Sequence, residues 1–167
     1  MTQQRPVDVL ILMGSDSDLP VMKPVGEVLD QLRVSWEMTV ASAHRSPARV
    51  QRLLEDAPGR GVKVFIVGAG AAAHLAGVVA AHSTKPVIGV PIDSSALKGL
   101  DALLSTVQMP PGVPVATVSI GKPGATNAGV LAAQIIGVAD QAIATKLDDY
   151  KRKLAEKVEA AAAKLNA

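Results

Sequence analysis

His44 and Arg45 are the neighbouring side chains best suited to chemistry in this sequence, within residues 41–47 (ASAHRSP). An imidazole can donate or accept a proton near neutral pH. A guanidinium can bind a phosphate or carboxylate through two parallel hydrogen bonds. On an arbitrary loop such a pair most often only faces solvent. At the ligand-binding edge of a sheet, it predicts acid–base chemistry on an anionic substrate.

Residues 14–20 (GSDSDLP) have the composition of a turn that opens a helix. Amides at a helix N-terminus, together with the hydroxyls of Ser15 and Ser17, can hold a phosphate, and a nearby carboxylate can accept hydrogen bonds from ribose hydroxyls. The same residues also suit a plain helix start, with Asp18 as the N-cap and Pro20 in the first turn. Both interpretations stay open at this point.

A third segment of small residues, 68–77 (GAGAAAHLAG), leaves its backbone bare, so that a flat ligand could lie against the amides. Its glycines, with Asp93 about 20 residues later, resemble the dinucleotide-binding fingerprint and keep an NAD-dependent oxidoreductase as an alternative. That alternative is weakened because Ala73 stands where the third glycine usually falls, and because the segment follows the third apolar run instead of the first. His74 is either a structural histidine or part of a site.

Other catalytic and metal-binding motifs are missing from the sequence. It contains no cysteine, no HExxH pattern and no Gly-x-Ser-x-Gly elbow. A zinc site would need His44, His74 and His82 to converge, whereas His82 suits the C-terminal end of a predicted helix. Residues 121–124 (GKPG) lack the spacing and the following hydroxyl of a P-loop. We therefore expect no metal.

Composition narrows the class of protein further. The chain has 167 residues, 49% of them hydrophobic and 19% charged, which predicts one globular domain. The 17 basic side chains nearly balance the 15 acidic ones, and one residue each of Trp, Tyr and Phe offers little stacking for bases, so nucleic-acid binding is not expected. The lack of cysteine fits a reducing, cytoplasmic setting.

Residues 64–81 are apolar enough to consider a membrane helix, but their glycines favour a strand, a turn and a helix, so no membrane contact is expected.

Short apolar runs alternate with helical patterns along the chain, as in proteins built from βαβ units. We expect strands at residues 7–13, 35–40, 62–67, 86–90 and 113–120, and helices at residues 19–32, 47–56, 71–81, 97–107 and 125–144. The strands are nearly continuous in Val, Ile and Leu, so helices should cover both faces of the sheet. This pattern predicts a doubly wound, flavodoxin-like parallel sheet in a three-layer α/β/α domain over residues 1–146. Ligands of such sheets bind beyond the carboxyl ends of the strands, where the three segments above would meet.

Residues 147–167 are rich in Lys, Glu and Ala and differ from the rest of the chain. Their apolar positions recur at helical spacing and predict an extra C-terminal amphipathic helix. These positions are Leu147, Tyr150, Leu154, Val158, Ala161 and Leu165. Because the domain already has enough helices to cover its sheet, we expect this stripe to form a contact between subunits. A frayed terminal helix is the alternative.

Taken in order, the motifs resemble those of the bacterial-type N5-carboxyaminoimidazole ribonucleotide mutases of purine biosynthesis. The matching segments, which cover most of residues 7–140, are 14–20, 42–45, 68–70, 72–75, 99–101, 104–105, 107–110, 112–118, 125 and 127–128. Several motifs in the right order are more specific than any single loop. Asp16 and residues 72–75 favour the mutase over the related carboxylase branch, which uses carbon dioxide directly and has a different first loop.

The resemblance implies a cofactor-free isomerase that moves a carboxylate from the exocyclic nitrogen of the imidazole ribonucleotide to ring carbon 4. It implies that His44 protonates that nitrogen as carbon dioxide leaves and later takes up the proton released from the ring carbon. A free imidazole, with a pKa of about 6.5, suits both directions. The resemblance also implies a homo-octamer with sites at subunit contacts.

The same resemblance implies which residues bind the substrate. Phosphate contacts are expected from Ser15, Ser42 and Arg45, and a contact with the ribose hydroxyls from Asp18. The remaining substrate-binding residues would face the base and the carboxylate with their backbone, or they would line a dry pocket around carbon dioxide. The full expected set is Ser15, Asp16, Asp18, Ser42, Ala43, Arg45, Gly70, Ala71, His74 and Leu75.

Four residues depart from the family pattern. Ala71 and Pro111 stand where glycine is usual, Ala76 replaces proline, and Ser46 replaces threonine. Ala71 matters most, because its methyl group would crowd the loop against the base if a positive φ is required there. A non-catalytic nucleotide-binding regulator is a further alternative, and such a protein would not need the His44 imidazole.

Overall fold

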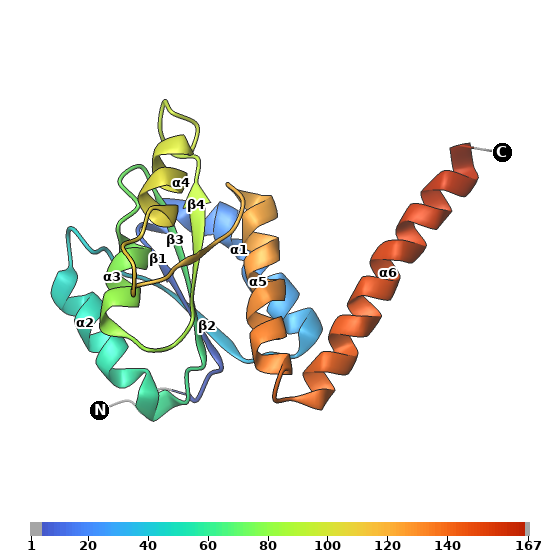
Figure 1. Cartoon of the computed structure of the whole chain (residues 1–167), viewed down its shortest axis with the longest axis horizontal. Coiled ribbons are helices and arrows are strands. Elements are labelled where there is room, and N and C mark those ends of the chain that lie inside the picture. Colours follow the sequence, from blue (N-terminus) through green and yellow to red (C-terminus); the bar gives the residue numbers. More distant parts are fainter. Residues whose placement is uncertain (1–4, 166–167) are drawn as a thin grey trace.

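The computed structural model describes residues 5–165 and contains one parallel sheet between two helical layers (Figure 1). The strand order is β2-β1-β3-β4-β5, and every neighbouring pair is parallel. The strands are β1 Val9–Met13, β2 Trp36–Val40, β3 Val64–Gly70, β4 Val87–Ile92 and β5 Ala116–Thr117. This order confirms the predicted doubly wound, flavodoxin-like sheet.

Alternate residues of the central strands face two separate cores. Val9 and Ile11 of β1 pack with helices α1 and α5, and Leu10 and Leu12 pack with helices α2 and α3 on the other face. The helices are α1 Leu19–Leu32, α2 Pro47–Asp56, α3 Leu75–His82, α4 Leu100–Val107, α5 Lys122–Gly137 and α6 Gln141–Leu165. Because both faces of β1 are covered, all five of its residues are buried, which explains its continuous apolar sequence.

The predicted bounds of α1 and α2 agree with the structure, whereas those around β3 do not. The strand predicted at 62–67 is β3 and continues to Gly70, so the glycines of the third segment extend the sheet instead of forming a helix. The helix predicted at 71–81 begins only at Leu75. Residues 71–74 form the turn between the two elements.

The C-terminal third of the chain differs more from the predictions. The strand predicted at 113–120 is reduced to Ala116–Thr117, because the prolines just before it cannot donate backbone hydrogen bonds to a neighbouring strand. The helix predicted at 125–144 is instead two helices, α5 ending at Gly137 and α6 beginning at Gln141. Asp140 separates them, because its Oδ1 accepts hydrogen bonds from the amides of Ala142 (3.0 Å) and Ile143 (3.2 Å).

Helix α6 therefore contains the predicted amphipathic segment but starts before Leu147; positions 166–167 lie outside the described residues. Its first turns pack on the domain through Ile143, Leu147 and Tyr150. Further along, the helix extends away from the domain (Figure 1), and the side chains of Leu154 and Val158 are 46% and 67% exposed. Within residues 5–165, no helix combines the length and the apolar character needed to cross a membrane.

The carboxyl ends of β2, β1 and β3 lie level at one edge of the sheet, since Met13 pairs with both Val40 and Gly68. The chain leaves β1 toward β2 on one side and later returns to build β3 on the other. This reversal of direction creates the crevice in which doubly wound proteins bind ligands. All three segments that the sequence analysis identified start at this edge.

Candidate functional site

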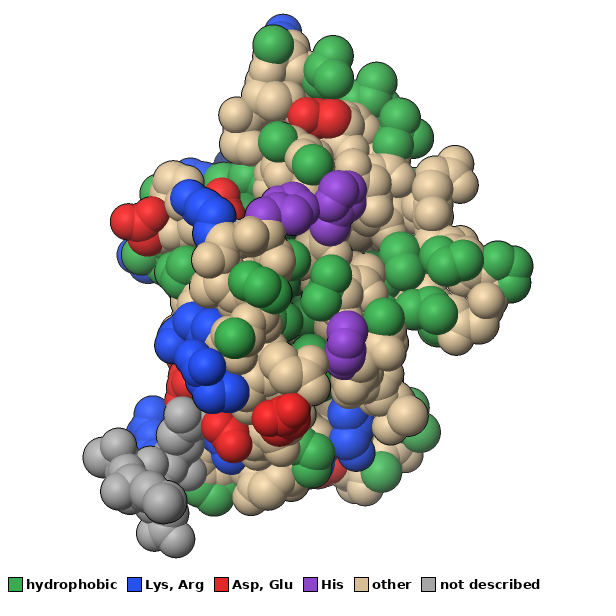
Figure 2. All heavy atoms as spheres, turned by 90° about the vertical axis from the view of Figure 1, so that its left-hand side faces the viewer, with side chains coloured by type: hydrophobic (Ala, Val, Ile, Leu, Met, Phe, Trp, Pro, Cys, Tyr) green, Lys and Arg blue, Asp and Glu red, His purple; other side chains and the backbone are tan. Residues whose placement is uncertain are grey.

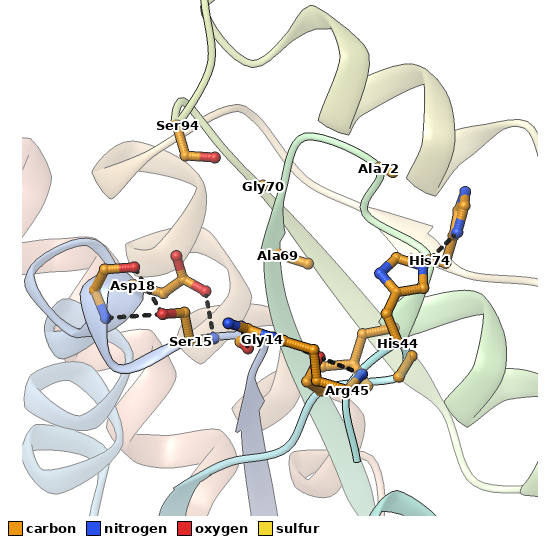
Figure 3. A pocket seen from close by; sticks show the side chains of 14 residues that line it. Gly14, Ser15, Asp18, His44, Arg45, Ala69, Gly70, Ala72, His74 and Ser94 are labelled. Carbon is orange, nitrogen blue, oxygen red and sulfur yellow. Dashed lines mark hydrogen bonds between the residues drawn. The ribbon is translucent and has the colours of Figure 1, made fainter. Parts of the chain in front are cut away.

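A cavity of about 320 Å³ occupies this edge of the sheet (Figure 3). The loops after β1, β2, β3 and β4 all contribute to its walls. Its lining residues are Gly14, Ser15, Ser17, Asp18, Ser42, Ala43, His44, Arg45, Ala69, Gly70, Ala72, His74, Leu75 and Ser94. Two predicted site residues are not among these: Asp16 lines an adjoining hollow with Arg49, and Ala71 lies in the turn just after β3.

The loop after β1 is held together by its own hydroxyl and carboxylate groups. The amide of Ser17 donates to Ser15 Oγ (3.3 Å), and the amide of Ser15 donates to Asp18 Oδ2 (3.0 Å). Asp18 is the N-cap residue of α1, as the sequence predicted, but its carboxylate makes no cap bond to that helix. It turns back instead to the Ser15 amide and forms a capping box with Ser15. Ser15 and Asp18 both face the cavity.

Asp18 is the buried carboxylate of the site, with only 6% of its surface exposed. Burial raises its pKa above the ordinary value, because removal from water disfavours the charged form. The hydrogen bond from the Ser15 amide and the positive charge of Arg45 act in the opposite direction. The loop thus holds this carboxyl group against a desolvation penalty, and its oxygens can accept hydrogen bonds from a bound ligand.

The Asp18→Asn variant is expected to unfold at a higher urea concentration than the native chain near pH 7. A carboxylate whose native pKa is raised favours folding at pH values below its unfolded pKa, and this contribution is lost as pH rises through the native pKa. The advantage of the neutral amide should therefore shrink toward about pH 3.5. Asp16→Asn, an exposed change in the same loop, is the control; an equal gain there at both pH values would contradict the burial argument.

The loop after β2 places Arg45 across the carboxyl end of β1. Ser46 Oγ accepts a hydrogen bond from the Ser42 amide (3.1 Å) and donates one to the Ser42 carbonyl (3.2 Å), which closes the loop before α2 begins at Pro47. The guanidinium of Arg45 donates to the Gly14 carbonyl (3.0 Å) and lies near Ser42 Oγ (3.4 Å). A positive fork and two serine hydroxyls therefore share one end of the cavity (Figure 3). This arrangement can bind a phosphate.

His44 is paired with His74, thirty residues further along the chain. His44 Nε2 and His74 Nδ1 are 2.8 Å apart, and the two rings meet edge to face with their centroids 5.0 Å apart. Such a contact requires one nitrogen to donate and the other to accept, so it restricts the tautomers of both rings. The other nitrogen of His44 points toward Ala69 across the cavity (Figure 3). His44 can therefore exchange protons with a ligand while His74 holds its orientation.

The third histidine lies away from this pair. His82 ends α3, and its Nδ1 lies 2.9 Å from the Val78 carbonyl. Figure 2 shows two histidine side chains together and one apart on the same face. The structure thus joins His44 with His74 and leaves His82 at a helix end, as its position in the sequence predicted.

The turn after β3 depends on close backbone packing. A Cβ atom at Gly70 would lie 1.8 Å from Ser94 Oγ, so only glycine leaves room for the loop after β4. Ala71 follows with a φ of +52°, a left-handed backbone conformation that residues other than glycine rarely adopt. The positive φ that the sequence analysis considered for this position is therefore present, and the alanine is strained there.

Replacing Ala71 with glycine should raise the free energy of unfolding by about 1 kcal/mol, because the left-handed conformation costs glycine nothing. Urea unfolding of the two proteins measures the difference. Ala72→Gly is the matched control, because the neighbouring alanine has no positive φ and its change should only increase the flexibility of the unfolded chain. Equal destabilisation by both glycines would contradict the assigned strain.

Ser94 follows β4 and lines the cavity, although no motif in the sequence pointed to it. Asp93, the acid on which the NAD-dependent alternative depended, lies outside the cavity lining. The order of the strands offers a signal for Ser94. Because β4 is the neighbour of β3, the residues after β4 also reach the edge of the sheet where ligands bind. A lone Ser-Ser pair after an apolar run was too common a pattern to single out.

Comparison with known proteins agrees with this geometry. The family model described as "AIR carboxylase" matches residues 8–157. A Bacillus subtilis protein named N5-carboxyaminoimidazole ribonucleotide mutase is 55% identical over 148 residues, which cover 89% of this chain and 91% of that protein. One of the same name from Pyrococcus horikoshii is 50% identical over 99% of this chain and 92% of its own length. The crystal structure of Treponema denticola PurE superposes with a TM-score of 0.86 at 29% identity, covering 95% of this chain and 98% of that one.

Proposed function

The chain belongs to the AIR carboxylase family, and from that premise we propose that it converts N5-carboxyaminoimidazole ribonucleotide into 4-carboxy-5-aminoimidazole ribonucleotide in purine biosynthesis. The observation that carries the proposal is one cavity that combines an arginine, a buried carboxylate and a paired histidine. These groups occur in a chain that is 55% identical to a named mutase over nearly its whole length. The isomerase reaction is favoured over direct carboxylation and over NAD-dependent oxidation.

The cavity suggests how the substrate is oriented. Its phosphate would bind at Arg45, Ser15 and Ser42, because these donors share one end of the cavity. The ribose hydroxyls would donate to Asp18 beside them. The imidazole ring would then reach the backbone of Gly70, with His44 on one side. Each contact uses a residue that lines the cavity.

A single imidazole can serve both halves of the reaction. In the first half the bond between the exocyclic nitrogen and the carboxylate carbon breaks, carbon dioxide leaves, and His44 gives a proton to the nitrogen. In the second half ring carbon 4 attacks carbon dioxide, and His44 takes the proton that this carbon loses. The protons balance, so the reaction needs no external acid or base. Carbon dioxide must stay in the cavity between the two steps, because recapture depends on proximity.

The His44–His74 contact supports this use of His44. If His44 Nε2 donates to His74 Nδ1, the cavity-facing nitrogen of His44 carries a free electron pair and can accept the proton. When that nitrogen is protonated, His74 still accepts the hydrogen bond, so the ring does not turn between the two steps. His74 thus acts as a positioning residue for His44.

An ultraviolet assay with freshly prepared N5-carboxyaminoimidazole ribonucleotide tests the proposal, without ATP, metal or added bicarbonate. Formation of the C4-carboxylated product well above spontaneous decay is expected. Product only from uncarboxylated ribonucleotide plus bicarbonate would instead indicate the carboxylase branch. No product from either substrate would contradict the proposal, and a fluorescence titration with NAD would then test the dinucleotide alternative.

We also propose that the chain forms a homo-oligomer, with an octamer as the expected state, through helix α6. The exposed part of α6 presents Leu154 and Val158 to solvent, and Leu165 near its end is 88% exposed. Helix α4 adds exposed Leu100 and Leu104. Apolar surfaces of this kind usually mark a contact with another protein. A second copy is the natural partner, because the resemblance implies an assembled enzyme.

Changing both Leu154 and Val158 to lysine is expected to reduce the molecular mass in solution to that of a smaller assembly. Light scattering coupled to size-exclusion chromatography measures this mass. Glu159→Lys is the control, because its spacing along α6 places it on the opposite side of the helix from the apolar stripe. An unchanged mass in the double variant would exclude this stripe as a subunit contact.

A further inference from the structure

We propose that Ser94 binds the carboxylate that the enzyme moves, by donating a hydrogen bond from its hydroxyl. This inference rests on the proposed mutase function and adds a substrate-binding residue from the loop after β4. Ser94 lies outside the segments whose match to the mutases is described above. Its place in the cavity becomes visible only when β3 and β4 are brought together.

Ser94 stands directly over the end of β3. Gly70 pairs with Ile92 in the register of β3 and β4, and Ser94 follows two residues later. A Cβ at Gly70 would lie 1.8 Å from Ser94 Oγ and 3.2 Å from the Ile92 carbonyl, so the missing side chain of Gly70 makes room for this hydroxyl. In Figure 3 the Ser94 hydroxyl points inward on the Gly70 side of the cavity.

The loop that carries Ser94 is braced by hydrogen bonds. Ser95 Oγ donates to Asp101 Oδ2 (2.7 Å) and accepts from the Leu97 amide (3.1 Å). The Ser95 carbonyl accepts from the Lys98 amide (3.1 Å), and Gly99 closes the loop with a φ of +83°. The hydrogen bond from Ser95 lowers the pKa of Asp101. Ser95 thus anchors the loop while Ser94 faces the cavity.

The order of groups along β3 indicates what Ser94 would meet. A Cβ atom placed on Gly14 would lie 3.6 Å from Asp18 Oδ2 and 3.9 Å from the Ala69 Cβ. The Asp18 carboxylate is therefore level with Ala69 along β3. Ser94 is level with Gly70, one residue further out. A ribonucleotide with its hydroxyls at Asp18 would therefore place its ring and carboxylate between Ser94 and His44. A hydroxyl can donate to a carboxylate, and such charge-assisted bonds are strong.

Equilibrium binding of two ribonucleotides tests the inference. We expect Ser94→Ala to weaken binding of the C4-carboxylated product about tenfold and to leave binding of the uncarboxylated 5-aminoimidazole ribonucleotide within about twofold. Ser105→Ala is the matched control: Ser105 Oγ donates to the Asp101 carbonyl (2.7 Å) near the same loop but does not line the cavity. Thermal unfolding of the variants checks that all of them fold.

Two results would overturn the inference. An equal loss of affinity for both ligands would place Ser94 at the ribose or phosphate, and no loss for either would remove it from the substrate. A native chain that binds and converts neither ribonucleotide would instead contradict the proposed function itself. In turnover assays, Ser94→Ala should also release more uncarboxylated ribonucleotide per molecule of product than the native chain, because carbon dioxide is held less firmly.

Discussion

The His44→Asn variant is expected to lose turnover by about 10²–10⁴-fold while it still binds the ribonucleotide. Asparagine keeps a polar group of similar reach but cannot exchange protons at neutral pH. The two proton transfers of the proposed reaction both pass through the His44 ring, so both halves would slow together. Initial rates at saturating substrate measure the loss of kcat, and equilibrium binding of the C4-carboxylated product measures the retained affinity.

His82→Asn is the matched control for this experiment. It removes an imidazole from the end of α3, where the ring contacts the Val78 carbonyl and lies outside the cavity. We expect its kcat to be unchanged within about twofold, as for a surface change away from the site. Full activity of His44→Asn would contradict the role of His44 and favour a regulator that binds a ribonucleotide without chemistry.

The Arg45→Ala variant is expected to raise KM by about 10- to 100-fold, with a much smaller effect on kcat. Arg45 is the basic side chain in the cavity lining besides the two histidines, and its fork lies beside Ser42 and the Gly14 carbonyl. Under the proposed binding mode, its removal would take away two charge-assisted hydrogen bonds to the phosphate that persist through the reaction. Contacts that are equally strong in ground state and transition state affect KM more than kcat.

Arg45→Lys separates charge from geometry. A lysine retains the positive charge but lacks the planar fork, so its KM should fall between those of the native chain and Arg45→Ala. Inorganic phosphate should inhibit the native chain more strongly than the alanine variant. If kcat falls and KM stays constant in Arg45→Ala, the guanidinium acts on the reacting carboxylate instead of the phosphate.

Much of the fold could be predicted because its signals are local. The bounds of α1 and α2 follow from apolar spacing and from prolines in the first helical turn, and these depend only on neighbours in the chain. Predictions failed where a local signal was ambiguous. The small residues at 68–74 suit both a buried strand and a helix, and only pairing with β4 extends β3 to Gly70.

In the candidate site, too, local sequence signals and tertiary contacts each decided a different part. The loops at residues 14–18 and 42–45 meet at the cavity as expected, because a parallel sheet brings the ends of its strands together whatever the loop details. Asp16 belongs to the set of substrate-binding residues that the resemblance implies, yet it lines the adjoining hollow with Arg49 and not the cavity itself.

The sequence by itself determined that the chain is a parallel α/β domain and which loops carry its reactive groups, because apolar periodicity and turn residues act over short distances. Tertiary structure alone decided that His44 contacts His74, that Arg45 reaches the Gly14 carbonyl, and that Ser94 covers Gly70. Each contact joins segments more than twenty residues apart. Their distance depends on which strands become neighbours, and that choice is made by burial of the whole sheet between two helical layers.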